Sequence, residues 1–216
     1  MSKSHLTKLS LQALLWAPLA VACSTPPTAC YTEPWVRPSL DVQNEIDANA
    51  RRLPWTHGRE RDELVKWFIK VGKPAFPALL KLSQDPRRDV AEAANNALCE
   101  ANKKHCKKDD TRLVSALQAL PWPGEEHIEL QLERARALLL LGDRSMLPHI
   151  IGGLEHERLL IRSLCAQYLY DETGERFGYE PGESAAERAR AIDCWNDWWA
   201  ICSTPSMEFA QADVGP

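Results

Sequence analysis

Glycine and β-branched residues are scarce in this chain of 216 residues. It contains 10 glycines, and valine, isoleucine and threonine are few, whereas leucine, alanine, glutamate and arginine are abundant. Because the abundant residues favour helices and the scarce ones favour turns and strands, the composition predicts an all-α protein. Hydrophobic residues make up 44% of the chain, which is enough to build a packed core.

The sequence patterns of common catalytic sites are also missing. There is no HExxH zinc motif, no Gly-x-Ser-x-Gly elbow, no phosphate-binding P-loop and no evident pair of catalytic carboxylates. The 26 lysines and arginines stand against 30 aspartates and glutamates, so the formal net charge is −4 and no basic surface for nucleic acid is expected. We therefore expect no enzyme, no cofactor, no metal site and no nucleic-acid partner.

No apolar run is long enough to cross a bilayer comfortably. The run near the N-terminus, Leu9–Ala22, has about 14 residues, whereas a spanning helix needs roughly 20. Lys3 and Lys8 precede it and Ala20-Val21-Ala22 ends it, which is typical of a secretory signal. The ending resembles a bacterial lipobox, which implies cleavage before Cys23 and lipidation of that cysteine. Plain secretion with a free cysteine and an uncleaved anchor are the alternatives.

These features divide the chain into four segments. Residues 1–22 are predicted to be a lipoprotein signal peptide, and residues 23–40 a tether in which four prolines exclude a helix. A helical body is expected over residues 41–202 and a disordered tail over residues 203–216. The predicted location is the bacterial outer membrane or the periplasm, with the protein held by its lipid anchor.

The body of the chain repeats an apolar helix, a polar turn and a second, amphipathic helix. Pro77 in the first copy matches Pro148 in the last, and Val90 matches Ile161 at the same spacing, about twice the roughly 35 residues of a helical-repeat unit. A degenerate middle unit begins at Thr111 and contains a Pro-Trp-Pro-Gly turn. We therefore expect about three helix pairs.

This pattern resembles the bacterial HEAT-like repeat family. The shared features are the turn Gly142-Asp143, a proline in the first helix and the hydrophobe–arginine pair Ile161-Arg162 at the start of the second. The first unit has Val90-Ala91 instead and lacks the arginine. Over about residues 60–170, the resemblance implies a short α-solenoid of about three HEAT-like helix pairs with helical caps. Such a solenoid presents an extended surface to protein segments.

A tryptophan-rich segment follows the repeats. The loop Thr173–Pro181 leads into a helix with Trp195, Trp198 and Trp199, a spacing that places all three on one face. The segment resembles the terminal cap of secreted bacterial HEAT-repeat proteins, which covers the apolar face of the last repeat. An aromatic platform for a ligand is the alternative. Helices over 41–52 and 60–71 are expected to form the opening cap.

Besides the cysteine predicted to carry lipid, six cysteines remain, an even number that favours disulfides in an exported chain. Cys99 and Cys106 are expected to close a short loop. Cys165 is expected to pair with Cys194 or Cys202 and to hold the cap in place. Buried free thiols are the alternative for each pair.

One dense basic run lies beside the first of these pairs. It is a candidate loop for an acidic partner or anionic lipid heads, and a solvated loop is the alternative. Its lysines are Lys103, Lys104, Lys107 and Lys108. Cys99, His105 and Cys106 lie near it, but a fourth metal ligand is missing, so no metal site is expected.

These predictions favour a lipid-anchored envelope protein that binds or scaffolds a protein partner, although the sequence does not identify that partner. A structural envelope protein without a specific partner is one alternative. Some HEAT-like proteins resemble phycobilin lyases, which makes a lyase-type enzyme another, but the predicted export argues against it.

Overall fold

The computed structural model describes residues 35–107 and 110–203, and within these ranges every regular element is helical. The α-helices are α1 (Leu40–Arg52), α2 (Gly58–Val71), α3 (Phe76–Leu82), α4 (Arg88–His105), α5 (Arg112–Gln118), α6 (Ile128–Leu140), α7 (Leu147–Gly152), α8 (Leu159–Thr173) and α9 (Ala185–Ser203). Short 3-10 turns are η1 (Leu53–Trp55), η2 (Lys73–Ala75), η3 (Glu125–His127), η4 (Arg144–Met146) and η5 (Gly153–Glu155). The prediction of an all-α protein is confirmed for the described residues.

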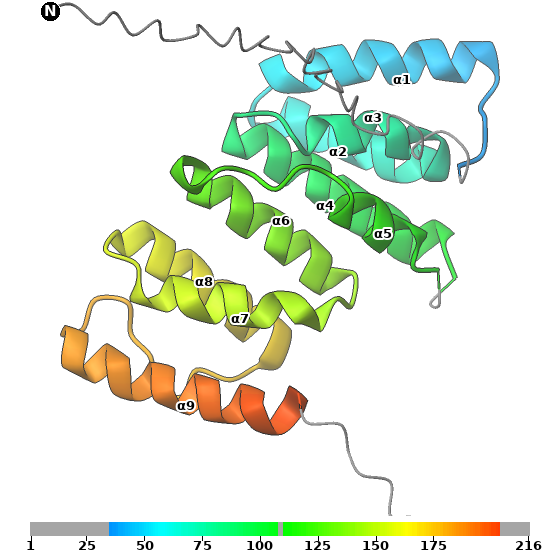
Figure 1. Ribbon diagram of the computed structural model, residues 1–216. Coiled ribbons are helices and arrows are strands. Elements are labelled where there is room, and N and C mark those ends of the chain that lie inside the picture. The colour runs from blue at the N-terminus through cyan, green and yellow to red at the C-terminus, as the bar shows by residue number, and fades with distance from the viewer. Residues whose placement is uncertain (1–34, 108–109, 204–216) are drawn as a thin grey trace, which may run out of the picture. The chain divides into compact units, whose positions relative to one another are not determined.

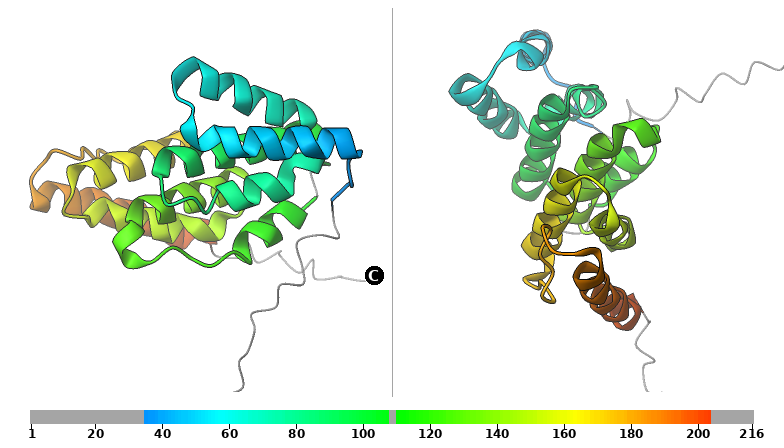
Figure 2. Two further views of the ribbon diagram at one scale, coloured as in Figure 1. Left: turned by 90° about the horizontal axis from the view of Figure 1, so that it is seen from above. Right: turned by 90° about the vertical axis from the view of Figure 1, so that its left-hand side faces the viewer.

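Neighbours along the chain are also neighbours in space (Figure 1). Helix α2 packs on α4, α4 on α6, and α6 on α8, so these four helices form a continuous row, here called the even row. The preceding helix of each predicted unit lies beside its partner: α3 on α4, α5 on α6 and α7 on α8. The right-hand view of Figure 2 looks nearly along the helix axes and shows the same order from top to bottom. Each of α4, α6 and α8 therefore contacts the helix that precedes it in the chain.

Two prolines and a glycine lie at helix ends. Pro77 and Pro148 lie in the first turns of α3 and α7, where a missing backbone N–H costs no helical hydrogen bond. Gly72 ends α2 with φ 74° and ψ −138°, a conformation that residues with a Cβ rarely adopt.

Helix α6 lies between two hydrophobic clusters. Ala137 and Leu138 belong to the first, which extends back to Trp35, whereas Leu132, Ala135 and Leu139 belong to the second, which extends to Trp195. A helix that is apolar on two sides is expected to be buried between neighbours. Its run of small and aliphatic residues is therefore explained by this position in the middle of the row.

The N-terminal boundary differs from the prediction. Trp35, placed in the predicted tether, is only 7% exposed and packs edge-to-face on Phe76 with ring centroids 5.0 Å apart. Ser39 is the N-cap of α1, and its Oγ accepts a hydrogen bond from the backbone N–H of Val42. The packed body thus begins before residue 41, because an indole ring gains more from burial than an extended segment gains from solvation.

At the other end, α9 packs on α7 and η5. Trp195 is 1% exposed, and its ring lies edge-on to Phe177 at 4.7 Å and to Trp198 at 5.5 Å. Trp198 and Trp199 are half-buried against the same cluster. The predicted inward direction is confirmed for Trp195 and holds in part for the other two tryptophans.

Close packing at Gly153 gives a first prediction. A Cβ added at Gly153 would lie 2.3 Å from Sγ of Cys165, which is buried between η5 and α8. Because this overlap forces a core side chain or the backbone to move, Gly153→Ala is expected to lower the free energy of unfolding by about 1–3 kcal/mol. Urea denaturation followed by circular dichroism measures this change.

Gly152 is the matched control, because nothing lies within 4 Å of a Cβ there. Its helical backbone suits alanine, so Gly152→Ala is expected to leave stability unchanged or slightly increased. Adding Cys165→Ala to the Gly153→Ala variant removes the overlapping sulfur and should recover part of the loss. Equal losses at the two glycines would show that the contact with Cys165 is not the cause.

Candidate functional site

Ion pairs join each helix of the even row to the next. Arg61 of α2 pairs with Asp89 of α4, with 2.6 Å between Nη1 and Oδ2. Arg88 of α4 pairs with Glu133 of α6, with 3.0 Å between Nε and Oε1. The link from α6 to α8 runs from Glu129 to Arg158, the residue before α8, at 2.6 Å. These pairs lie toward the N-terminal ends of the helices in the row. The edge of the fold that carries the turns before these helices is therefore a strip of alternating charge.

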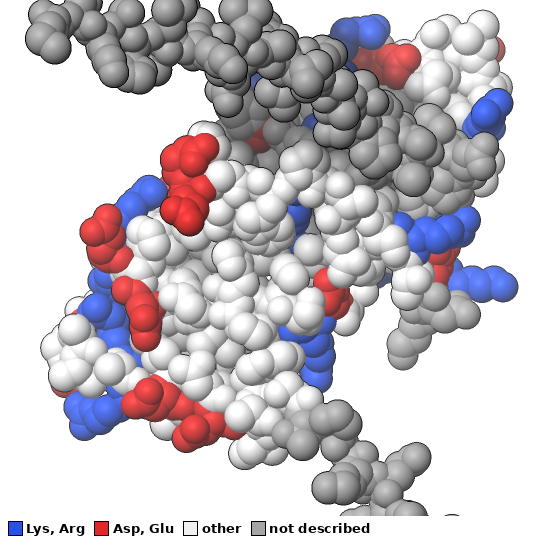
Figure 3. All heavy atoms as spheres, in the orientation of Figure 1, with Lys and Arg blue, Asp and Glu red and all other residues white. Residues whose placement is uncertain are grey.

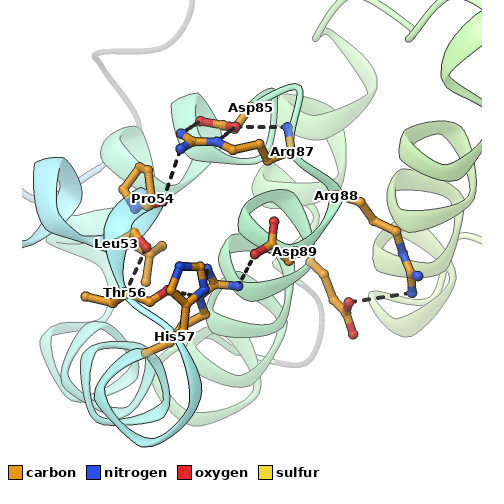
Figure 4. Close-up of polar contacts among 10 residues, drawn as sticks. Leu53, Pro54, Thr56, His57, Asp85, Arg87, Arg88 and Asp89 are labelled. Carbon is orange, nitrogen blue, oxygen red and sulfur yellow. Dashed lines mark hydrogen bonds and ion pairs between the residues drawn. The ribbon is translucent and has the colours of Figure 1, made fainter.

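Figure 4 shows the part of this strip around the turn between α3 and α4. Arg87 donates two hydrogen bonds to the carboxylate of Asp85 and a third to the carbonyl of Pro54, 33 residues earlier. Its guanidinium also lies 5.2 Å from the ring centroid of Trp55, an indole that is 78% exposed. Arg87 thus fixes this turn against the turn between α1 and α2. The Trp55 ring beside it stays exposed at the surface. The guanidinium also lowers the pKa of the Asp85 carboxyl.

The same edge is visible from outside the molecule. In Figure 3, charged side chains gather along the left-hand edge, where the turns before α6 and α8 lie, while the surface over α6 and α7 is mostly free of charged groups. The face of the described body is therefore divided into a charged rim and a neutral middle.

Glu133 is the buried centre of the even row. Its side chain is 1% exposed, and Oε1 accepts hydrogen bonds from Nε of Arg88 at 3.0 Å and from the hydroxyl of Tyr168 at 2.7 Å. Arg88, Glu133 and Tyr168 therefore connect α4, α6 and α8. Its second oxygen, Oε2, is buried and has no hydrogen-bond partner, which is unusual for a buried carboxylate.

Burial dominates the electrostatics of this cluster. It raises the pKa of Glu133, although the hydrogen bonds from Tyr168 and Arg88 oppose the shift. Burial also raises the pKa of Tyr168, and the neighbouring carboxylate adds to this effect, so the phenol stays protonated and donates. The guanidinium of Arg136 lies 5.2 Å from the Tyr168 ring centroid and donates to Asn96 at 2.9 Å. The arrangement can hold one proton or one buried charge at the centre of the row.

A second buried polar contact explains the degenerate middle unit. After the short helix α5, the chain does not continue as a helix through the Pro-Trp-Pro-Gly turn. Arg134 of α6 donates hydrogen bonds to the carbonyls of Leu120 and Pro121, and Gln131 donates to those of Pro123 and Gly124. Both side chains are under 10% exposed. They replace the hydrogen bonds that a longer α5 would make internally.

These charged and amide side chains were missed by the sequence reasoning. The run around residues 130–141 is mostly apolar but contains three charged residues, Glu133, Arg134 and Arg136. A charged residue inside an otherwise buried helix needs a partner. That rule would have marked Glu133 and Arg134, but not the residues that pair with them.

The predicted disulfides are absent among the described cysteines, which are all free thiols. Helix α4 continues to His105, so Cys99 lies inside the helix and not at its end, about 10 Å along the axis from Cys106 at 1.5 Å per residue. A disulfide requires Cα atoms within about 7 Å. Cys165 is buried, whereas Cys194 and Cys202 are exposed on α9, so the proposed staple of the cap is not formed.

Burial makes two of these thiols unreactive. It raises the pKa of Cys99 and that of Cys165 to about 12 in each case. Because the thiolate is the nucleophile and the metal ligand, both side chains behave as small apolar groups at neutral pH. Two cysteines lie outside the described residues: Cys23, the predicted lipid carrier, and Cys30, the remaining member of the six considered for disulfides.

The basic run is only partly a loop. Lys103 and Lys104 are exposed in the last turn of α4, where positive charge favours the helix C-terminus, and Lys103 pairs with Glu100 at 2.8 Å. Lys107 is exposed after the helix, and Lys108 lies outside the described residues. The placement favours the solvated alternative for the first two lysines.

Among residues 35–107 and 110–203, no three His, Cys, Asp or Glu side chains are grouped to hold a metal ion. No helix in the same ranges is both long and apolar enough to cross a bilayer. In comparisons with known proteins, no protein-family model, curated protein or solved structure matches this chain.

Proposed function

We propose that the chain is a lipid-anchored protein of the cell envelope that binds or scaffolds a protein partner through an α-solenoid of HEAT-like helix pairs. The observation that carries the solenoid is the even row, in which α2, α4, α6 and α8 pack in chain order. Stacks built only from neighbour contacts present long surfaces, and such surfaces commonly bind protein segments. The step from this architecture to binding is an analogy between folds.

The contacts within the row support a rigid surface. One ion pair joins each helix of the row to the next, and the cluster around Glu133 ties three helices together. Buried polar groups of this kind tie the register of neighbouring helices to one arrangement. A surface whose helices already keep one register loses little conformational entropy when it binds a partner.

The anchor is a proposal from the N-terminal sequence, in which the small residues before Cys23 follow a short apolar run. Cells grown with radiolabelled palmitate are expected to yield labelled protein, and Cys23→Ser is expected to abolish the label and release the protein from the membrane fraction. Label retained by the serine variant would contradict the anchor. A secreted, unlabelled wild-type protein would favour cleavage with a free cysteine.

Binding is tested separately by photocrosslinking in intact cells. A benzophenone amino acid placed at Glu92 or Lys103, which lie on the solvent-accessible side of α4, is expected to capture one recurrent protein. The matched control is the same amino acid at Asn44, exposed on α1 outside the even row. Absence of a recurrent product at every position would favour the structural alternative without a specific partner.

A further inference from the structure

A cavity of about 200 Å³ lies between α8, the loop that joins α8 to α9, and α9 itself. The loop returns along α8, since the carbonyl of Pro181 accepts a hydrogen bond from Arg162, near the start of that helix. All three segments contribute side chains to the walls, among them Ala166, Gln167, Tyr179 and Trp195. The cavity therefore lies where the cap covers the last helix of the even row.

The size and the walls of the cavity suit a small molecule with one aromatic ring. Pockets for drug-sized ligands measure about 300–1,000 Å³, whereas an engineered apolar cavity of about 150 Å³ accepts benzene. Trp195 and Tyr179 contribute aromatic side chains to the walls, and Ala166 contributes a small apolar one. A single ring with one small polar substituent is therefore the expected size of the ligand.

Arg176 gives this cavity a positive charge. It is the one charged side chain among the described residues that line the cavity. Its guanidinium lies over the Tyr170 ring, 4.3 Å from the ring centroid, and no carboxylate of the described residues forms an ion pair with it. A guanidinium stacked by its face keeps its N–H groups free at the edge, and two of them match the two oxygens of a carboxylate.

Two further arginines lie near the wall formed by Tyr179. Arg162 is 9% exposed and donates hydrogen bonds to three backbone carbonyls. Arg188 donates to the carbonyl of Glu183, and its Nε is buried without a hydrogen-bond partner. Neither arginine forms an ion pair with a carboxylate in the part of the chain that the structure describes. Burial raises the pKa of Tyr179, and the charges of Arg188 and Arg162 oppose that shift, so both charges act on this wall.

The acidic residues of the loop are not among the described walls of the cavity. Those exposed to solvent, where water and salt screen their charge, are Glu175, Glu180 and Glu183. Asp171 is also exposed, and it accepts a hydrogen bond from the wall residue Gln167 at 2.6 Å. Because Arg162 and Arg188 are more buried than these acids, their charge is screened less. The cavity therefore favours an anion over a cation.

The loop holds the cavity in a fixed shape. The hydroxyl of Tyr179 donates a hydrogen bond of 2.6 Å to the carbonyl of Leu154. Phe177, next to Arg176, packs edge-on against Trp195 with ring centroids 4.7 Å apart, and its φ is 48°. An uncommon backbone conformation of this kind persists where the surrounding structure holds it. Because the walls are fixed before a ligand arrives, binding costs little further ordering.

We propose that this cavity binds a small aromatic carboxylate. The ring of the ligand lies against Trp195 and Tyr179, and its two carboxylate oxygens accept hydrogen bonds from the guanidinium of Arg176. The indole of Trp195 then has two roles, since it packs in the cap and forms part of a ligand site. The site depends neither on the lipid anchor nor on the protein partner proposed above.

The test is equilibrium dialysis of the full chain with radiolabelled benzoate and phenylacetate. At least one of these acids is expected to bind with a dissociation constant in the millimolar range or below, as ligands of so few atoms do. Benzamide and phenylacetamide have the same shape without the charge. They are expected to compete at least tenfold more weakly, because they lose the charge-assisted hydrogen bonds. Acetate and inorganic phosphate carry charge without a ring and are also expected to compete at least tenfold more weakly.

Two variants test the charge and the space separately. Arg176→Gln is expected to weaken binding of the acid at least tenfold and to remove its advantage over the amide. The matched control is Arg59→Gln on α2, whose side chain is 93% exposed, with affinity unchanged within twofold. Ala166→Leu fills the cavity from the α8 wall and is expected to abolish binding, while circular dichroism shows the helix content of the wild type.

Each other result would overturn the inference. Equal affinity for an acid and its amide, or for Arg176→Gln and wild type, would show that Arg176 does not bind a carboxylate. Phosphate or acetate that competes as well as the aromatic acids would show a general anion site. Absence of binding by both aromatic acids at millimolar concentrations would also refute the site. All of these results leave the anchor and the protein partner to their own tests by palmitate labelling and crosslinking.

Discussion

Trp195→Ala is expected to lower the free energy of unfolding by about 3–5 kcal/mol, the usual cost of deleting a buried aromatic side chain. Trp195 is 1% exposed and packs against Phe177 and Trp198, so its removal leaves a cavity between α9, α8 and the loop that joins them. Phe177 has φ 48°, an uncommon conformation for a residue with a side chain, and its ring loses its support. Urea denaturation followed by circular dichroism measures the loss.

Trp55→Ala is the matched control for this experiment. Trp55 is 78% exposed, and the guanidinium of Arg87 lies 5.2 Å from its ring centroid. An exposed cation–π contact contributes about 0.5–1 kcal/mol, so the loss should stay within that range. Losses of equal size at Trp55 and Trp195 would mean that the cap does not depend on the buried indole.

Arg88→Leu is expected to lower the free energy of unfolding at pH 7.5 by about 2–4 kcal/mol. Removing one partner of a buried ion pair typically costs about 3–5 kcal/mol, and the 30% exposure of Arg88 lets water replace part of the contact. The variant leaves the carboxylate of Glu133 buried with Tyr168 as its remaining donor. The loss should shrink as the pH falls, because a protonated Glu133 needs no cation.

The pH dependence of Glu133 has a definite sign. Burial raises its folded pKa above the ordinary value of 4.5, so the folded protein binds this proton more tightly than the unfolded chain does. The resulting stability is fully present below about pH 4.5 and is lost as the pH rises through the folded pKa. Relative to Glu133→Gln, which keeps an acceptor for Tyr168 and Arg88 but has no charge, the wild type should therefore become less stable between pH 4.5 and 7.5.

The double variant Arg88→Leu with Glu133→Gln completes a thermodynamic cycle for this pair. Without a charge to bury, the loss caused by Arg88→Leu should fall to about 1 kcal/mol, near the worth of one hydrogen bond. A loss that is the same with glutamate and glutamine at position 133, or that does not change with pH, would contradict a buried charge at this position.

The helices were predictable because each one carries its own signals. The prolines in the first turns of α3 and α7 and the 3.6-residue spacing of apolar residues in α4 and α8 are local properties of a helix, and the structure has these helices. The start of the body was predicted less well. Ser39 caps α1, two residues before the predicted start of the helix, and Trp35 joins the core, because these choices depend on what lies next to the segment.

The disulfide predictions show what local sequence signals leave undetermined. An even cysteine count says nothing about distances, and a helix that continues through Lys103 and Lys104 to His105 moves Cys99 and Cys106 too far apart to pair. The inward direction of Trp195 was predictable from spacing on one helix, whereas the exposure of Cys202, four residues after Trp198, was not. The tertiary structure decides which neighbour packs on a helical face and how far along the helix that contact extends.

By itself the sequence determined an all-α body and a buried tryptophan in the last helix, because helical periodicity and helix ends are encoded within a few neighbouring residues. Tertiary structure alone decided that Arg88, Glu133 and Tyr168, from three different helices, share one buried carboxylate oxygen. The physical reason is that hydrogen bonding and burial act between residues 35–45 positions apart in the chain, and only packing brings such residues into contact.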